Sequence, residues 1–222
     1  MRCVFSPCTI TEEQFLAASR PWARYQSDYR PLVEFAKAHG IPVIASNVPR
    51  RIASDVSKTG GSALDALGTD RGLAAHELPC PANGDYYDRF QQMMGGHPPS
   101  GDPAAAEDQI RNDRFFLAQC LKDETMGESI AEAWQKNASR RATVVHVNGA
   151  FHSDYAEGTA ASAARRLSGR RIAVVSIVPV DDIDAEKPGP GDLTRGDYLI
   201  YTVKPVTAAV QAFPPPRTSS PR

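Results

Sequence analysis

The sequence predicts an α/β protein with a mainly parallel sheet flanked by helices. Helical patterns alternate along the chain with short apolar runs rich in β-branched residues, an order typical of layered α/β folds. The apolar runs lie at Ile41–Ala45, Thr143–Asn148, Arg171–Val180 and Tyr198–Val203. With 222 residues and no internal repeat, the chain is long enough for one large domain with a substantial core.

In the first part of the chain, local signals predict two helices and a strand. Thr11 precedes two glutamates and can cap a helix that ends near Pro21. A second helix is expected over Tyr29–His39, because Pro31 suits its first turn and Gly40 suits its end. The run Ile41–Ala45 then predicts a buried parallel strand.

The rest of the chain continues this alternation. The longest helix is expected over Ala104–Asn137, where apolar residues recur near every 3.6 positions. The other expected elements are a weak helix over Arg51–Leu67 broken by Gly60 and Gly61, a short helix over Asp85–Met94, a strand over Thr143–Asn148, a helix over Glu157–Leu167, and strands over Arg171–Val180 and Tyr198–Val203.

Three segments follow from these patterns. Residues 1–10 form an atypical N-terminal segment, and residues 11–205 form the single α/β domain. Residues 206–222 form a tail rich in Pro and Ser that we expect to be disordered.

Composition excludes several classes of partner. The 25 basic and 26 acidic residues give a formal net charge of −1, which argues against nucleic acid or an anionic membrane held by bulk charge. No apolar run approaches the length of a transmembrane segment, and the chain as given has no signal peptide pattern. The four cysteines follow no zinc spacing and do not require disulfides, and Cys120 is expected to be a small buried hydrophobe.

Polar residues follow two of the expected strands. Asn47 and Arg50 come after the first, and Asn148, His152, Asp154 and Tyr155 come after the second. Chemistry in open α/β proteins gathers beyond the carboxyl ends of parallel strands. Arg50 could hold a carboxylate and His152 could ligate a metal or move a proton, although a structural salt bridge and a solvated turn are the plain alternatives.

The longest expected helix carries a second polar feature. Gln119 lies on its apolar face and Asp123 follows one turn later, so both could share a polar pocket. A core glutamine satisfied by its neighbours is the alternative. His146 lies inside an expected strand and is interpreted as a core histidine.

Several motifs together resemble the ChaN-like family of haem-binding uptake proteins in the Tiki superfamily. They are Ser19–Trp22, Asp28–Leu32, Ile41–Arg50 with its Asn-x-Pro-Arg element, Ala118-Gln119, Asp123, Thr125-Met126 and Val147–His152 with its Gly-x-x-His element. The resemblance covers roughly Thr11 to Val203.

The resemblance implies a haem-binding protein that serves haem or iron uptake. In some members a tyrosine binds haem at the surface and two copies pair around their haems, and Tyr29 and Tyr155 are the candidates here. The other candidate cofactor-binding residues are Asn47, Arg50, Gln119 and His152. Kinship to metal-dependent proteases and erythromycin-esterase-like hydrolases implies the alternative, a metal-dependent hydrolase with His152 as metal ligand or base and Arg50 on the substrate.

The chain departs from the family at its start. Members usually open with a strand that ends in a Gly-Glu-x-His type motif, whereas only ten unrelated residues precede Thr11 here. We therefore expect a start that is truncated and a sheet that lacks its first strand. The family is often exported or anchored to a membrane, and a truncated start could have carried that signal.

Overall fold

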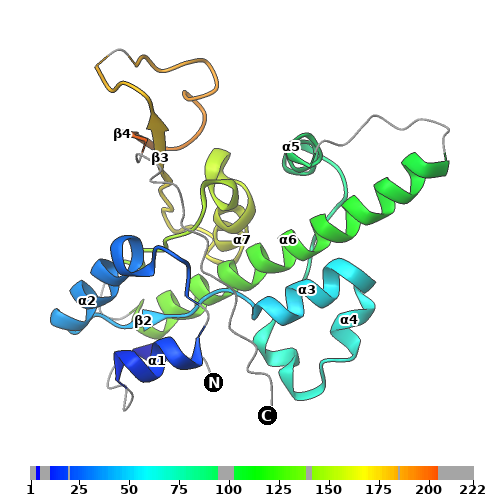
Figure 1. Cartoon of the computed structure of the whole chain (residues 1–222), viewed down its shortest axis with the longest axis horizontal. Coiled ribbons are helices and arrows are strands. Elements are labelled where there is room, and N and C mark those ends of the chain that lie inside the picture. Colours follow the sequence, from blue (N-terminus) through cyan, green and yellow to red (C-terminus); the bar gives the residue numbers. More distant parts are fainter. Residues whose placement is uncertain are drawn as a thin grey trace, which may run out of the picture. The chain divides into compact units, whose positions relative to one another are not determined.

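The computed structural model describes residues 4–5, 11–19, 21–94, 103–138, 142–184 and 186–204. The chain divides into two compact units, Met1–Ile172 and Ala173–Arg222 (Figure 1). Both helices and strands are present, so the α/β character is confirmed in this coarse form.

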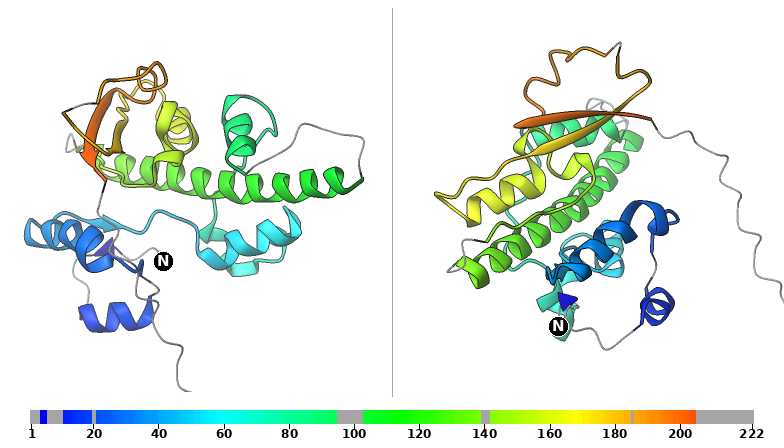
Figure 2. Two further views of the ribbon diagram at one scale, coloured as in Figure 1. Left: turned by 45° about the horizontal axis from the view of Figure 1, so that its top comes forward. Right: turned by 90° about the vertical axis from the view of Figure 1, so that its left-hand side faces the viewer.

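The first unit is built around one long helix, α6, which spans Pro103–Asn137. Helix α3 (Arg50–Thr59) and the short α4 (Ser62–Asp65) lie on one side of it, and α5 (Asp85–Met93) and α7 (Gly158–Arg166) lie on the other (Figures 1 and 2). Ile52, Val56 and Leu121 are completely buried in a core that α3, α4 and α6 share with the 3-10 turn η2 (Gly68–Leu73).

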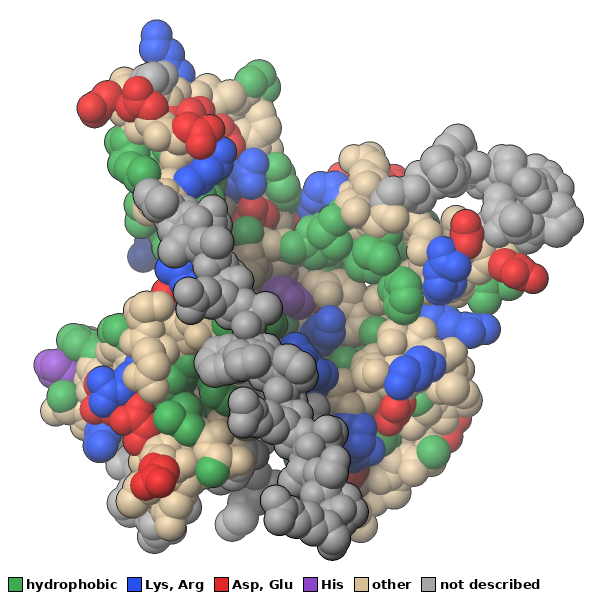
Figure 3. Space-filling model, viewed as in Figure 1, with side chains coloured by type: hydrophobic (Ala, Val, Ile, Leu, Met, Phe, Trp, Pro, Cys, Tyr) green, Lys and Arg blue, Asp and Glu red, His purple; other side chains and the backbone are tan. Residues whose placement is uncertain are grey.

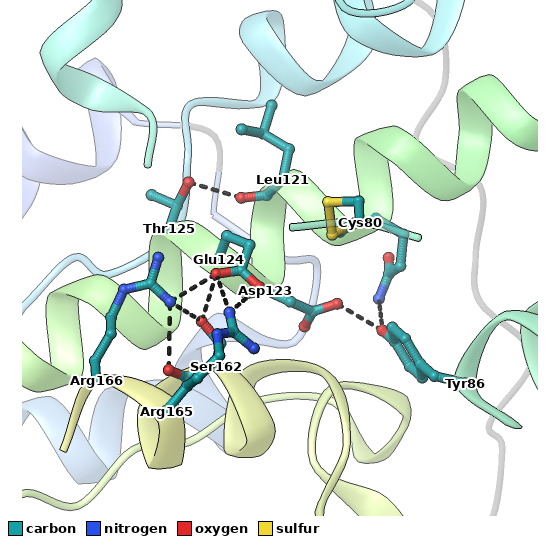
Figure 4. The surroundings of a disulfide bond; sticks show 11 residues. Cys80, Tyr86, Leu121, Asp123, Glu124, Thr125, Ser162, Arg165 and Arg166 are labelled. Atoms are coloured by element: carbon teal, nitrogen blue, oxygen red, sulfur yellow. Dashed lines mark hydrogen bonds and ion pairs between the residues drawn. A yellow bond between two sulfur atoms is a disulfide. The ribbon is translucent and has the colours of Figure 1, made fainter. Parts of the chain in front are cut away.

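Helix α7 packs closely on α6 because a glycine and a buried charge cluster face it. A Cβ atom at Gly127 would collide with the side chain of Ser162 and lie 2.9 Å from the backbone nitrogen of Ala163. One turn earlier, the buried Glu124 carboxylate pairs with Arg165 and Arg166 and accepts a hydrogen bond from Ser162 (Figure 4). These contacts fix the register of the two helices.

A disulfide joins Cys80, in the segment before α5, to Cys120 on α6 (Figure 4). Cys120 is buried, as the sequence predicts, but it is paired with Cys80 and is not a free thiol. Cysteine spacing of 40 residues carries no pairing signal, because only the folded chain brings the two sulfur atoms together.

The N-terminal helices form as expected, with one difference. Thr11 and Gln14 make a capping box at the start of α1 (Glu12–Ala18). Helix α2 spans Arg30–Ala38 and is preceded by a π-helical turn, η1 (Tyr25–Tyr29). Arg30 pairs with Glu12, which links α2 to α1.

The first two expected strands differ from the prediction. Strand β2 covers only Val43–Ile44 and pairs antiparallel with β1 (Val4–Phe5), so Ile41–Ala45 is not a buried parallel strand. Residues 142–149 pair with no strand among the described residues, and Val145 and Val147 are 82% and 63% exposed. An apolar run becomes a strand only where a neighbouring chain completes its hydrogen bonds, which the sequence does not reveal.

The second unit contains the last two strands among the described residues. Strand β3 (Val175–Val180) pairs in parallel with β4 (Tyr198–Val203), with Val175 opposite Tyr198. Asp192 orders the connection between them, since its carboxylate accepts hydrogen bonds from the Tyr201 hydroxyl and the Gly189 N–H. The expected mainly parallel sheet is thus represented, in the described residues, by one two-stranded parallel pair.

The predicted terminal segments fall largely outside the described residues. Of residues 1–10 only Val4 and Phe5 are described, and none of residues 206–222 is. Among the described helices, none combines the length and the apolar character that crossing a bilayer requires.

Replacing Gly127 by Ala should destabilise the first unit by about 1–3 kcal/mol, because the added methyl group meets Ser162 and the α7 backbone. Urea unfolding of both proteins measures the difference. Gly72→Ala is the matched control, since a Cβ atom there has no neighbour within 4 Å. A loss no greater than that of the control would contradict the close packing.

Removing the disulfide in the Cys80→Ala, Cys120→Ala double variant should lower the free energy of unfolding by about 4 kcal/mol. This value is the conformational entropy that the unfolded chain regains when the loop of 40 residues between the cysteines is opened. Melting curves with and without dithiothreitol measure it. The reductant should lower the melting temperature of the wild type and leave that of the double variant unchanged; equal sensitivity in both would contradict the assignment.

Candidate functional site

The buried carboxyl group of Asp123, on α6, collects hydrogen bonds from three other segments. It is 2% exposed. The Tyr86 hydroxyl on α5 donates to Oδ2 at 2.5 Å, and the Thr159 hydroxyl on α7 donates to Oδ1 at 2.8 Å. The third partner is His152, whose Nδ1 lies 2.7 Å from Oδ1. Asp123 is therefore the centre of the candidate site.

His152 ends a short 3-10 turn, η4 (Ala150–His152), that follows Gly149. Its Nδ1 donates to Asp123, which fixes the ring orientation. Among the described residues, Nε2 of His152 makes no hydrogen bond. A histidine held by a carboxylate at Nδ1 is the arrangement used where Nε2 serves as a ligand or a base.

Gln119 lies one turn before Asp123 on α6 and completes the cluster. Its amide nitrogen lies 3.0 Å from Nδ1 of His152 and donates to the Tyr86 hydroxyl at 3.3 Å. Burial, together with the charge of Asp123 and the hydrogen bond to it, raises the pKa of Tyr86 far above its usual range. The raised pKa keeps Tyr86 protonated near neutral pH, so its hydroxyl can donate to Asp123.

The backbone that leads from His152 into α7 takes unusual conformations. The turn η5 (Asp154–Ala156) has positive φ at Tyr155 and Ala156, and Gly158 has φ +50°. A Cβ atom at Gly158 would lie 2.8 Å from the His152 carbonyl oxygen and 3.0 Å from Oδ1 of Asp123. Only glycine allows this close approach.

Arg89, on α5, contacts two residues of the turn that leads into α7, Tyr155 and Glu157. Its guanidinium lies 4.3 Å from the centroid of the Tyr155 ring and forms an ion pair with Glu157. Such a guanidinium stacked on an aromatic ring contributes about 0.5–1 kcal/mol at exposed sites. Helix α5 therefore supports the site twice, through Tyr86 and through Arg89.

A second cluster of polar residues, Ser46, His146 and Asn148, connects the chain after Ile41–Ala45 with the run Thr143–Asn148. Nε2 of His146 lies 3.0 Å from the Ser46 hydroxyl, and its Nδ1 lies 3.2 Å from Oδ1 of Asn148. The Ser46 carbonyl accepts a hydrogen bond from Ser129 on α6. Burial lowers the pKa of His146, and the hydrogen bond to Asn148 opposes that shift.

The structure brings some of the predicted site residues together and separates others. Gln119 and His152 meet at Asp123. Asn47 and Arg50 are exposed, and the Arg50 guanidinium lies 5.7 Å from the centroid of the Trp22 ring. Tyr29 is exposed at the end of η1, and Tyr155 lies under Arg89.

Sequence reasoning missed three polar partners: Tyr86, Thr159 and Ser46. Tyr86 lies in the helix expected over Asp85–Met94, and its partner Asp123 is 37 residues away. Nothing in the local sequence marks Thr159 or Ser46, because their partners lie 36 and 100 residues away.

The residues at His152 do not fit a divalent metal ion. Structural and catalytic zinc sites use at least three protein ligands. Within the described part of the chain, no group of three or more His, Cys, Asp or Glu side chains could hold a metal ion. His152 and Asp123 instead bind each other.

Residues 4–162 match the family described as "Haem-binding uptake, Tiki superfamily, ChaN". The match covers well over half of the 222 residues and includes the segment that carries His146 and His152. The chain belongs to this ChaN family. No curated protein and no solved structure matches the chain.

Acidification should destabilise the protein partly through His146. Because its pKa in the folded state lies below the unfolded value of about 6.5, the unfolded state binds the proton first as the pH falls. Stability is then complete above pH ~6.5 and declines below it, at no more than about 1.4 kcal/mol per pH unit for one proton.

Urea unfolding of wild type and His146→Gln between pH 7.5 and 5 measures this dependence. The variant should lose less stability on acidification than the wild type. His39→Gln is the matched control, because His39 is exposed at the end of α2. Identical pH dependence in wild type and His146→Gln would show that His146 does not couple folding to pH.

Proposed function

We propose that this ChaN-family protein binds haem at its surface, with the Tyr29 phenol as the iron ligand. The observation that supports it is the exposed Tyr29 hydroxyl in a family described as haem-binding. Tyr29 is 40% exposed, and its hydroxyl makes no hydrogen bond among the described residues. A tyrosine phenolate is an established ligand of ferric haem.

The chain on both sides of Tyr29 carries apolar side chains that suit the rest of a haem molecule. Trp22, Leu32 and Phe35 are large apolar side chains that are mostly exposed on the same stretch of chain. Hydrophobic side chains are visible at the surface over α2 (Figure 3). Such exposed apolar surface is typical of a ligand or partner site.

Arg50 offers a charge partner for the propionate groups of haem. It begins α3, is exposed, and lies beside Trp22 rather than in an ion pair among the described residues. A guanidinium matches a carboxylate with two parallel hydrogen bonds. Asn47 precedes it in the same loop and could add a polar contact.

The other candidate ligands are less well placed. Arg89 covers one face of the Tyr155 ring, and the backbone there is held at φ +63°. His152 and Gln119 belong to the Asp123 cluster, where a flat macrocycle would have to displace buried hydrogen bonds. We therefore assign haem to the Tyr29 surface and a supporting role to the Asp123 cluster.

An exposed site of this kind suits haem uptake, because haem bound at a surface can be passed to another protein without unfolding the carrier. It also suits a homodimer in which two copies cover each other's haems. The metal-dependent hydrolase remains the weaker alternative, since the residues around His152 do not fit a metal ion.

Titration with hemin should give a saturable shift of the Soret band. Tyr29→Phe should raise the dissociation constant for hemin at least about tenfold, which corresponds to ~1.4 kcal/mol, because the iron loses its ligand. Size-exclusion chromatography of the loaded protein tests whether hemin promotes dimer formation.

Two further variants make the titration specific. Tyr198→Phe removes another exposed tyrosine, on β4 and outside the family match, and should bind hemin like the wild type. Loss of affinity in Tyr155→Phe but not in Tyr29→Phe would move the ligand to the turn after His152. A wild-type protein without a saturable Soret shift would overturn the proposal.

A further inference from the structure

Ser46, His146 and Asn148 form a chain of hydrogen bonds that neither family membership nor haem binding explains. The Ser46 hydroxyl lies 3.0 Å from Nε2 of His146, and the opposite ring nitrogen lies 3.2 Å from Oδ1 of Asn148. A hydroxyl, an imidazole and a carbonyl oxygen in this order are the parts of an activated nucleophile.

The hydrogen bonds of Asn148 determine which nitrogen of His146 carries the proton. Its amide Nδ2 donates to the Gly149 carbonyl oxygen at 3.0 Å, which turns Oδ1 toward His146. Because Oδ1 only accepts hydrogen bonds, Nδ1 of His146 must be the protonated nitrogen. Nε2 then carries the lone pair and accepts the hydrogen bond from the Ser46 hydroxyl.

We propose that Ser46 is the nucleophile of a second site that cleaves small carboxylic esters, with His146 as general base and Asn148 as the residue that orients it. This site shares the Asn47–Arg50 loop with the haem surface proposed above, but it acts through other side chains and does not depend on haem binding.

The position of Ser46 suits this role. Ser46 is half-buried and Asn47 beside it is exposed, so a small ester can approach while the hydroxyl stays fixed. The hydrogen bond from Ser129 anchors the Ser46 backbone to α6. Helix α3 starts at Arg50, so the positive end of its dipole lies close in the chain to the nucleophile. The lowered pKa of His146 keeps its ring neutral at pH 7, as a base must be.

The reaction follows from these roles. The Ser46 oxygen attacks the ester carbonyl carbon while its proton moves to Nε2 of His146. The carbon–oxygen bond to the leaving group breaks, and the leaving alcohol takes that proton, so an acyl group remains on Ser46. A water molecule then gives a proton to His146 and attacks the acyl carbon. The bond between that carbon and the Ser46 oxygen breaks, the Ser46 oxygen takes the proton from His146, and the carboxylic acid leaves.

A fluorophosphonate probe tests the nucleophile directly, because the serine oxygen displaces fluoride and stays bonded to phosphorus. Peptide mass spectrometry of the labelled wild-type protein should place the probe on Ser46. Turnover of p-nitrophenyl acetate should show a burst, and Ser46→Ala should lower its rate at least about 100-fold.

Matched variants separate chemistry from folding. Ser57→Ala removes a hydroxyl that, within the described residues, donates only to the Ser54 carbonyl of α3, and it should react like the wild type. Asn148→Leu should slow labelling about tenfold or more, and Asn148→Asp should restore it, since a carboxylate again accepts the Nδ1 proton. Circular dichroism checks that each variant is folded.

The outcomes of these measurements are distinct from those of the hemin titration. Absence of both the burst and the label on Ser46 in the wild-type protein overturns the proposal, as does a label on another residue that survives in Ser46→Ala. The hemin titration decides only the haem proposal, and the burst and the label on Ser46 decide only the esterase proposal.

Discussion

The buried carboxyl group of Asp123 ties together segments that are remote in the sequence. It lies on α6 and forms hydrogen bonds with Tyr86 on α5, with Thr159 on α7 and with His152 in the turn η4. An acceptor this deeply buried is costly unless its lone pairs are filled, so each donor is a structural requirement as well as a feature of the site. Two further features bring these segments together. Gly158 has no Cβ atom, so the chain can pass close to Asp123 and the His152 carbonyl oxygen. The disulfide between Cys80 and Cys120 attaches the segment before α5 to α6.

The two partly buried histidines differ because their partners differ. His152 faces a carboxyl group, whereas His146 faces an amide oxygen and a serine hydroxyl. They are close enough that His152 contributes to the lowered pKa of His146, after burial, the largest cause. At His146, burial favours the neutral form of the ring, whereas the hydrogen bond to Asn148 favours the charged form. One small region thus offers two imidazoles with different hydrogen-bond partners, and the haem surface proposed at Tyr29 uses neither.

The helices could be predicted to within a few residues because their signals are local. Thr11 and Gln14 cap α1 through neighbours three residues apart, and the periodicity of the longest helix predicted α6 from Ala104, one residue from its observed start. Strand pairing could not be predicted in the same way. Ile41–Ala45 and Thr143–Asn148 have the composition of buried strands, yet the first forms a two-residue antiparallel pair and the second is unpaired among the described residues. Strands β3 and β4 were themselves predicted because both runs are long and apolar, but only the structure shows that they pair with each other.

The sequence by itself determined the family and singled out candidate site residues such as Arg50, Gln119 and His152, because the Asn-x-Pro-Arg and Gly-x-x-His elements and the periodicity around Gln119 are local patterns. Only the tertiary structure decided which of those residues meet. It placed Gln119 and His152 against Asp123, left Arg50 beside Trp22, and set Ser46 against His146 across 100 residues. The physical reason is that a hydrogen bond depends on distances of about 3 Å, and neither spacing along the chain nor residue type specifies a distance between segments that fold together.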